Sequence, residues 1–305
     1  MTSDARVVDD APAAGPTVAL GAAPEKRIAG SSRLRPLRLT GWYTLLTVLA
    51  IIVLFPVYIT VVRALSTPVA YSDARSPLYP VAIQWDVFWR AATSQGLSRA
   101  LLLSAIMTIV ITVAQLVTSV LAAYAFAFLE FPFKKTLFGL FMATLMLPIE
   151  VTLIPNVQTI SDLGWLNSMQ GLTVPFLATA LGTFLIRQGF VGVPADLRDA
   201  ARLDGYGHLR FMWHVAVPLA RPVIAAFTVL SFLAAWNQYL WPQSVETLDN
   251  WQTAQVALSN LPTAEPATYN VGVAGALIVA LPVLIVLLVF QRQLVRGLTA
   301  GAVKG

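Results

Sequence analysis

The chain has 305 residues, of which 57% are hydrophobic and only 11% are charged, with a formal net charge of +5. Soluble globular proteins carry about 25% charged residues, so this composition excludes an ordinary soluble domain and indicates an integral membrane protein. The chain contains no cysteine, which excludes disulfides, thiolate chemistry and cysteine-based metal sites.

The N-terminal segment, residues 1–38, differs in composition from the rest of the chain. It is rich in Ala, Pro, Ser and Arg, with acidic residues early and basic residues late. It lacks the apolar run of a signal peptide. The composition predicts a cytoplasmic tail that is disordered to about residue 35. An arm that docks on another protein is the alternative.

Apolar stretches long enough to cross a bilayer follow in chain order. A spanning helix needs about 20 mostly apolar residues, and the sequence predicts six such helices. They lie at about residues 41–63, 100–129, 136–156, 167–187, 220–243 and 270–291. Pro148, Glu150 and Pro155 interrupt the outer end of the third. The expected fold class is all-α, a polytopic membrane protein with six transmembrane helices.

The basic residues predict which side of the membrane each loop lies on. Loops on the cytoplasmic side carry an excess of Lys and Arg. With a cytoplasmic N-terminus, 16 of the 20 basic residues lie on that side. Only Arg63, Arg75, Arg90 and Arg99 lie outside. Both termini are therefore expected in the cytoplasm, and because topology accounts for the basic charge, no nucleic-acid partner is expected.

A charged stretch within a cytoplasmic loop at residues 194–219 separates the fourth and fifth spans. Asp196 and Asp199 come at the start of a predicted helix, where acidic side chains suit the helix dipole. Ala200 and Ala201 share a face with Leu197 and Asp204 by their spacing. Adjacent alanines give this helix a narrow ridge that another surface can approach closely.

Gly205 and Gly207 predict a break and a sharp turn after this ridge. A second helical piece follows, whose predicted apolar side consists of Leu209, Met212, Trp213 and Ala216. Pro218 and Pro222 mark the entry to the fifth span. An amphipathic helix lying on the lipid surface is the alternative. That alternative accounts for Trp213 and the arginines, but not for the acid-Ala-Ala start or the glycine break.

The spacing in this loop resembles the loop signature of ABC importer membrane subunits. Asp199-Ala200-Ala201 is followed by Gly205 and then by Val215-Ala216-Val217-Pro218. In that family the loop forms a coupling helix that sits in a cleft of a separate ATPase subunit. The resemblance implies the type I ABC importer permease fold. It assigns ATPase coupling to Asp196, Asp199, Ala200, Ala201, Asp204, Gly205 and Pro218.

Two residues depart from the family pattern. Asp199 stands where the family has Glu, so an ion pair with the ATPase needs a closer approach. Arg198 stands where the family often has an acidic residue. The C-terminal residues 297–305 resemble the tail of carbohydrate-type permeases related to the maltose system, in which the tail reaches toward the ATPase dimer.

Four motifs narrow the resemblance. They are TLMLPIEV (144–151), FLIRQGF (184–190), DAARLDG (199–205) and WNQYLWP (236–242). Together they resemble the second permease subunit of importers for sn-glycerol-3-phosphate and glycerophosphodiesters such as glycerophosphocholine. The implied function is one half of the translocation pathway of an ATP-driven importer. The alternative is a permease subunit of a maltose- or trehalose-type sugar importer.

No G-x-x-x-x-G-K-[ST] phosphate loop occurs in the sequence. We therefore expect no enzyme activity and no cofactor in this chain, with ATP and Mg used by a partner ATPase. The resemblance implies a sister permease subunit, two ATPase subunits and an extracellular or periplasmic substrate-binding protein, in the lipid of a bacterial cell membrane.

Competing classes of membrane protein are a secondary carrier, a channel and a membrane enzyme. Proton-driven carriers keep ionisable residues within their spans, whereas the spans predicted here are nearly free of charge. His208 and His214 are six residues apart, which does not put them on one helix face, so we expect no metal site. No Ser-His-Asp arrangement or pair of acidic residues suggests enzyme chemistry.

Candidate residues of the substrate path lie near the end of the fifth span. They are Trp236, Asn237, Gln238, Tyr239 and Trp241, together with Glu150 in the third span. Asn and Gln at membrane depth need hydrogen-bond partners, and an aromatic belt with contacts between helices is the alternative. Glu150 would repel a phosphate, so we expect a structural or gating role, or a contact with the cation of a phosphodiester headgroup. Arg187 could meet an anion on exit, or it could follow from topology alone.

Overall fold

The computed structural model describes residues 34–261 and 268–299. In these ranges the regular secondary structure is helical, joined by turns and irregular connections, and a single β-bridge pairs Ser66 with Ile83. The chain divides into two units, Met1–Phe55 and Pro56–Gly305, which are described separately. Most of the predicted N-terminal tail (residues 1–33) and the end of the C-terminal tail (residues 300–305) lie outside the described residues.

The described part of the first unit is the beginning of helix α1 (Leu34–Leu65). Apolar side chains such as Trp42, Ile52 and Val53 are exposed there. A helix that is apolar on all sides is stable only when lipid or protein surrounds it. This part of α1 therefore requires an apolar environment.

Three described helices are long and apolar enough to cross a membrane by themselves. They are Leu39–Leu65, Val87–Phe128 and Tyr269–Gln293. Three further pairs of described helices pass the same test only when each bent pair is counted as one span. By length and composition, the described chain therefore holds between three and six spans.

The predicted third span is bent rather than continuous. Helix α5 (Lys134–Ala143) runs into the 3₁₀ turn η2 (Thr144–Met146), and α6 (Ile149–Asp162) follows in a new direction. The break falls at Leu147, whose backbone is extended. A residue that precedes proline avoids the helical conformation, so the sequence at Leu147-Pro148 accounts for the bend.

The predicted fourth span is also broken. Helix α7 (Met169–Thr173) and the turn η3 (Val174–Phe176) meet α8 (Ala180–Val191) at a bend of 42°. The bend frees backbone carbonyls, which are costly in an apolar layer without a partner. The amide of Gln115 donates to the Phe176 carbonyl at 2.8 Å, and the Thr118 hydroxyl donates to the Leu177 carbonyl at 3.0 Å.

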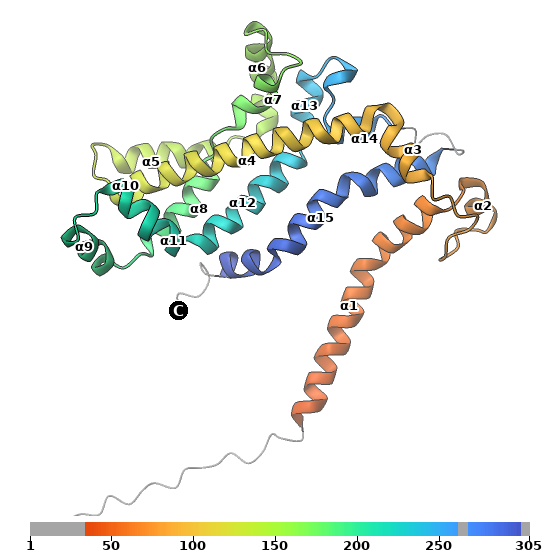
Figure 1. Ribbon diagram of the computed structural model, residues 1–305, viewed down its shortest axis with the longest axis horizontal. Helices are drawn as coiled ribbons and strands as arrows, with labels where there is room; N and C mark the ends of the chain where they lie inside the picture. Colours follow the sequence, from red (N-terminus) through yellow and green to blue (C-terminus); the bar gives the residue numbers. More distant parts are fainter. Residues whose placement is uncertain (1–33, 262–267, 300–305) are drawn as a thin grey trace, which may run out of the picture. The chain divides into compact units, whose positions relative to one another are not determined.

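Helix α4 (Leu97–Phe128) is the centre of the second unit. It packs against α8 and α12 (Arg221–Trp236), and α12 packs on α15 (Tyr269–Thr299), as Figure 1 shows. Gly182 of α8 allows close approach, because a Cβ at this position would clash with Ser119 of α4 and Phe227 of α12. Small residues play this part at helix contacts in membranes.

The two ends of α4 contact different parts of the chain. A 32-residue helix is about 48 Å long. Near its start, α4 packs against α3 (Val87–Thr93) and α14 (Ala254–Ser259). Past its end, the Lys134 ammonium donates to the Leu129 carbonyl at 2.7 Å, as basic side chains do at helix C-termini.

Short helices complete the described fold. The predicted fifth span, residues 220–243, consists of α12 and then α13 (Leu240–Val245), separated by non-helical residues. Helix α2 (Pro68–Asp73), the turn η1 (Ser94–Gly96) and the turn η5 (Asp249–Trp251) belong to the connections. The 194–219 loop forms α9 (Ala195–Leu203), α10 (His208–Phe211), the π-turn η4 (Met212–Ala216) and α11 (Val217–Leu219).

Candidate functional site

The first helix of the 194–219 loop, α9, has a well-defined beginning and end. Pro194 precedes it and Asp196 lies in its first turn. At the end, Gly205 has a φ of +74°, its N–H donates to the Arg202 carbonyl, and the Tyr206 N–H donates to the Ala201 carbonyl at 2.8 Å. This is a Schellman termination, which favours glycine at the left-handed position. The predicted break at Gly205 is confirmed.

The face of α9 that carries most of the predicted coupling residues is open. Among them only Ala201 is buried against the rest of the chain. Asp199 makes long ion pairs with Arg198 at 3.8 Å and Arg202 at 4.0 Å; the side chains of Asp199 and Arg202 are well exposed, and that of Arg198 is partly exposed. Exposed pairs of this kind contribute little to stability. The other residues, Asp196, Ala200, Asp204 and Gly205, are exposed, and Pro218 is half-buried.

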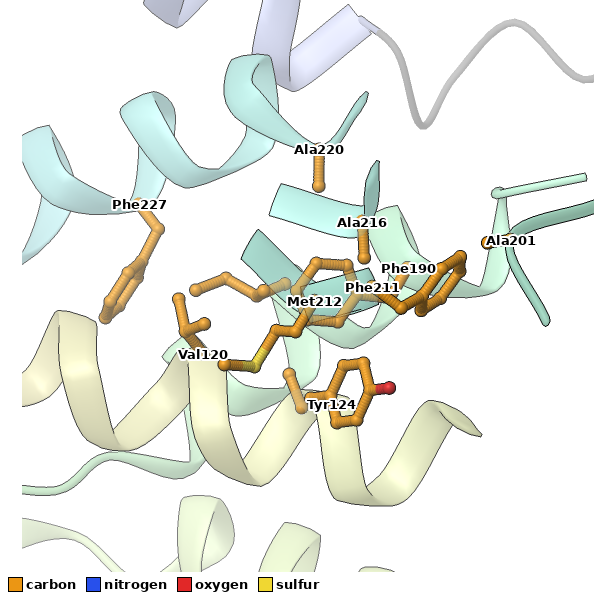
Figure 2. Packing of buried hydrophobic residues seen from close by; sticks show 11 residues of the cluster. Val120, Tyr124, Phe190, Ala201, Phe211, Met212, Ala216, Ala220 and Phe227 are labelled. Carbon is orange, nitrogen blue, oxygen red and sulfur yellow. The ribbon is translucent and has the colours of Figure 1, made fainter. Parts of the chain in front are cut away.

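A cluster of buried apolar side chains fixes the loop to the spans (Figure 2). Phe211, Met212 and Ala216 come from the loop, Tyr124 from α4 and Phe190 from α8. The rings of Tyr124 and Phe190 meet edge to face, with centroids 6.3 Å apart. Such pairs stabilise beyond the area that they bury. The loop is therefore attached to the ends of two helices and is not merely a surface segment.

A hydrogen bond joins α4 to the same loop. The Tyr124 hydroxyl lies 3.1 Å from Nδ1 of His208. Beside this bond a cavity of about 110 Å³ is lined by Tyr124, Arg198, Arg202 and Tyr206, among others. His208 and Phe211 of α10 line the same cavity, so the packing between α9, α10 and the end of α4 is incomplete.

The predicted apolar side of the second helical piece is only half right. Met212 and Ala216 are buried, but the exposed fractions of Leu209 and Trp213 are 69% and 56%. Phe211 is buried in their place. The cause is the π-turn η4, because a wider turn changes the residue spacing on which the prediction depended. Leu209 and Trp213 therefore present apolar surface outward.

The two tryptophans of the candidate substrate path are buried inside this chain. The indole N–H of Trp236 donates to the Val279 carbonyl at 3.1 Å, and that of Trp241 donates to the Gly171 carbonyl at 3.1 Å. Both side chains are 3% exposed. These hydrogen bonds join α12 to α15 and α13 to α7, so both tryptophans serve contacts between helices.

The polar candidates of the path are more accessible. Asn237 is exposed, and its Nδ2 donates to the Leu233 carbonyl at 2.9 Å. Tyr239 and Gln238 are half-buried, and the Gln238 Oε1 has no hydrogen-bond partner among the described residues. Glu150 is exposed in the first turn of α6. Asn237, Tyr239 and Glu150 therefore remain accessible to another chain or to a ligand, whereas the Oε1 of Gln238 is buried.

Arg187 and His214 contact groups of this chain itself. The Nε of Arg187 donates to the Phe126 carbonyl at 3.1 Å, and its guanidinium lies 4.4 Å from the ring centre of Phe138. His214 Nδ1 lies 3.0 Å from the Arg210 carbonyl oxygen. Arg187 thus joins α8 to the end of α4 and to α5.

The sequence did not predict that Tyr124 contacts the 194–219 loop. Tyr124 stands in a long uncharged run and has no local pattern that distinguishes it. Its partner His208 is 84 residues further along the chain. The one sequence motif near this contact is FLIRQGF (184–190), whose Phe190 packs against Tyr124.

Comparison with known proteins identifies the class. A family described as "Binding-protein-dependent transport system inner membrane component" matches residues 115–300, more than half of the chain. The chain belongs to this family, whose members are permease components of ABC importers in bacterial inner membranes. It is therefore a membrane transport component and not an enzyme.

Curated relatives cover nearly the whole chain. It is 35% identical over 264 residues to the "sn-glycerol-3-phosphate transport system permease protein UgpE" of Yersinia pestis bv. Antiqua (strain Antiqua), covering 84% of this chain and 94% of the relative. It is 36% identical over 265 residues to the protein of the same name from Salmonella typhi, with the same coverage.

A solved structure shows the same fold. It is described as a bacterial ABC transporter involved in the import of the acidic polysaccharide alginate. The TM-score is 0.75 at 24% identity, covering 86% of this chain and 98% of that chain. This likeness supports the type I permease fold that the loop motif implied.

Proposed function

We propose that this chain forms one half of the translocation pathway of an ATP-driven importer for glycerol-3-phosphate or glycerophosphodiesters. The relatives named for sn-glycerol-3-phosphate transport support this substrate class. The structural observation that carries the transport role is the exposed pair Asp199 and Ala200 on α9, whose Ala201 belongs to the buried cluster that joins the loop to α4 and α8. A polar ridge fixed firmly to the spans is suited to transmit movement into them.

We further propose six spans with both termini in the cytoplasm. Three continuous helices and three bent pairs allow this number, and the third pair counts residues 208–219 of the loop together with α12 as one span. The distribution of Lys and Arg over the loops supports the orientation. In this topology the 194–219 loop faces the cytoplasm and the start of α4 faces outward.

The proposed partners are a sister permease subunit, two ATPase subunits and a substrate-binding protein outside. ATP binding closes the ATPase dimer, and the 194–219 loop moves with it and opens the passage outward. Hydrolysis of ATP resets the passage inward. The loop couples the two events only if its contacts with the ATPase differ between the two states. Of the candidate path residues, Asn237, Tyr239 and Glu150 are those exposed enough to meet the sister subunit or the substrate.

The test is uptake of labelled glycerol-3-phosphate, glycerophosphocholine and trehalose by cells with and without the gene. We expect loss of uptake of at least one phosphate ester, with trehalose uptake unchanged. Loss of trehalose uptake alone would contradict the substrate class and favour the sugar importer, while leaving the importer architecture in place.

A further inference from the structure

A second, larger cavity lies at the start of α4. Its volume is about 440 Å³, within the range of about 300–1,000 Å³ that is common for small-molecule sites. We call it the Arg99 cavity. Its polar lining residues are Gln95, Arg99, Asp249, Asn250, Gln252 and Asn260.

The Arg99 cavity and the 194–219 loop lie at opposite ends of α4. Arg99 is the third residue of this 32-residue helix, whereas Tyr124, which contacts the loop, lies four residues before its end. The helix separates them by most of its length, a distance comparable to the thickness of a bilayer. If the loop is cytoplasmic, the Arg99 cavity opens on the outer side, where substrate arrives.

Arg99 and Arg75 differ from the other two basic residues predicted on that side, and of this pair it is Arg99 that lines the cavity. The guanidinium of Arg63 lies 4.4 Å from the ring centre of Tyr269. Arg90 forms an ion pair with Asp86 at 2.9 Å. Arg99 is exposed and makes no ion pair or ring contact with any residue that the structure describes. It therefore has a free planar donor group, the group best suited to hold a phosphate.

The opposite wall of the cavity is ordered by its own hydrogen bonds. The side-chain amide of Gln252 donates to Oδ1 of Asp249 at 3.1 Å, and the side-chain amide of Asn260 donates to Oε1 of Gln252 at 3.3 Å. These two hydrogen bonds fix Asp249, whose second carboxylate oxygen has no hydrogen-bond partner among the described residues. A carboxylate oxygen accepts hydrogen bonds from hydroxyl groups and also suits a cationic headgroup.

The backbone at the rim is unusual. Gln95 has a φ of +49° and Gly96 has a φ of +68°. Glycine adopts this conformation freely, but a residue such as Gln does so at a cost, and such strain is concentrated at functional sites. The first N–H groups of α4 follow directly and add positive potential.

We propose that the Arg99 cavity binds a small phosphate ester that carries free hydroxyl groups, before the ester enters the translocation pathway. Arg99 binds the phosphate, and Asp249 with the side-chain amides of Gln95 and Asn250 binds the hydroxyls. This inference rests on the proposed function and its orientation, and it adds a binding site on the permease itself. A polar cavity of this size favours a small molecule over a segment of the binding protein.

The test uses the importer complex purified with its partner subunits but without the binding protein. Isothermal titration calorimetry with sn-glycerol-3-phosphate measures the affinity of the wild type, Arg99→Gln and Arg75→Gln. Arg75 is an exposed arginine in the same predicted outer region, so it is the matched control for charge. We expect Arg99→Gln to weaken binding about tenfold or more, as removal of a charge-assisted hydrogen bond predicts, and Arg75→Gln to change it less than twofold.

Three further measurements sharpen the result. Arg99→Lys keeps the charge and should recover part of the affinity, which separates the role of the guanidinium from a folding defect. Glycerol and inorganic phosphate should each bind more weakly than the ester. Asp249→Asn should weaken binding of the ester but not of inorganic phosphate.

Two outcomes would overturn the proposal. One is the absence of saturable binding of sn-glycerol-3-phosphate by the wild type. The other is equal binding by the wild type and Arg99→Gln, which would show that the guanidinium does not hold the ester. In either case, if wild-type cells still take up the ester, only this proposal fails. Cells that take up no phosphate ester would contradict the proposed function itself.

Discussion

The hydroxyl of Tyr124 lies 3.1 Å from Nδ1 of His208, which joins the end of α4 to the 194–219 loop. The ring of Tyr124 also contacts Phe128 and Phe190. The outer face of α9, by contrast, has only weak exposed ion pairs. A force applied to α9 by a partner therefore reaches α4 through a dense aromatic cluster and one hydrogen bond.

Replacing Tyr124 by Phe tests this connection. The substitution removes the hydrogen bond to His208 but keeps the ring in the cluster, at a cost of about 1 kcal/mol in stability. We expect a several-fold loss of uptake with the complex still assembled, because the loop is held less firmly to α4. The control is Tyr206→Phe in the same loop, whose hydroxyl makes no hydrogen bond with the described residues. Equal uptake by both variants would show that the hydrogen bond plays no part in coupling.

Reversing the charge of Asp199 tests the contact with the ATPase. Its only ion pairs are long and exposed, so Asp199→Lys should change the stability of this chain by no more than about 0.5 kcal/mol. We expect the complex to dissociate or uptake to fall at least about tenfold, because an ATPase cleft that accepts an acidic residue would repel a lysine. Co-purification and uptake measure this.

The control for charge reversal is Asp73→Lys in α2, an exposed acidic residue far from the loop in sequence. It should assemble and transport normally. Full assembly and uptake in Asp199→Lys would contradict the coupling role of α9.

Gly205 and Gly207 form a matched pair for the turn after α9. Neither has a neighbour that an added Cβ would meet, but only Gly205 has a positive φ, +74°. Gly205→Ala should therefore cost about 1–2 kcal/mol and misplace α9, whereas Gly207→Ala should be nearly neutral. Thermal stability in detergent and uptake measure both effects. Similar losses in the two variants would mean that backbone conformation is not what requires glycine here.

The close approach of α8 to α4 and α12 depends on Gly182. A Cβ at this position would overlap the ring of Phe227 and the hydroxyl of Ser119, and overpacking of this kind costs about 1–3 kcal/mol. We expect Gly182→Ala to lower the temperature of unfolding in detergent. Gly139→Ala in α5 is the control, since nothing lies within 4 Å of its Cβ position, and it should not destabilise.

Glu246 gives the described fold a dependence on pH. Its Oε2 accepts a hydrogen bond from the Thr253 N–H at 3.1 Å, and its Oε1 has no partner among the described residues. Burial raises the pKa of this carboxyl from 4.5 to about 7, and the Thr253 N–H opposes the rise more weakly. Glu246 lies outside the helices that could cross the membrane.

The direction of the pH effect follows from proton binding. The folded protein holds this proton more tightly than the unfolded chain. The contribution of Glu246 to the free energy of unfolding is therefore fully present below about pH 4.5 and is lost as the pH rises to about 7. The slope is at most about 1.4 kcal/mol per pH unit. Glu246→Gln should lack this pH-dependent part of the stability. Thermal stability of the variant and the wild type, compared from about pH 4.5 to about pH 7, measures the difference. Parallel curves for the two proteins would contradict the assignment.

The sequence by itself determined the helical fold class, the ABC importer family and the turn at Gly205. These follow from local properties. Charged side chains are costly in lipid, so apolar runs mark membrane helices, and the left-handed turn requires glycine within a few residues of the helix end. The 194–219 loop shows both properties within a short stretch: charged residues between two apolar runs, and a glycine at the end of a helix. This is why its motif was recognisable.

Only the tertiary structure decided which residues meet across the chain. It placed Trp236 and Trp241 in contacts between helices, and it turned Leu209 and Trp213 outward through the π-turn η4. It also joined Tyr124 to His208 across 84 residues of sequence. In membrane helices nearly every residue is apolar, so hydropathy does not tell which side faces a neighbouring helix. That choice depends on how the spans pack, and packing depends on the whole chain.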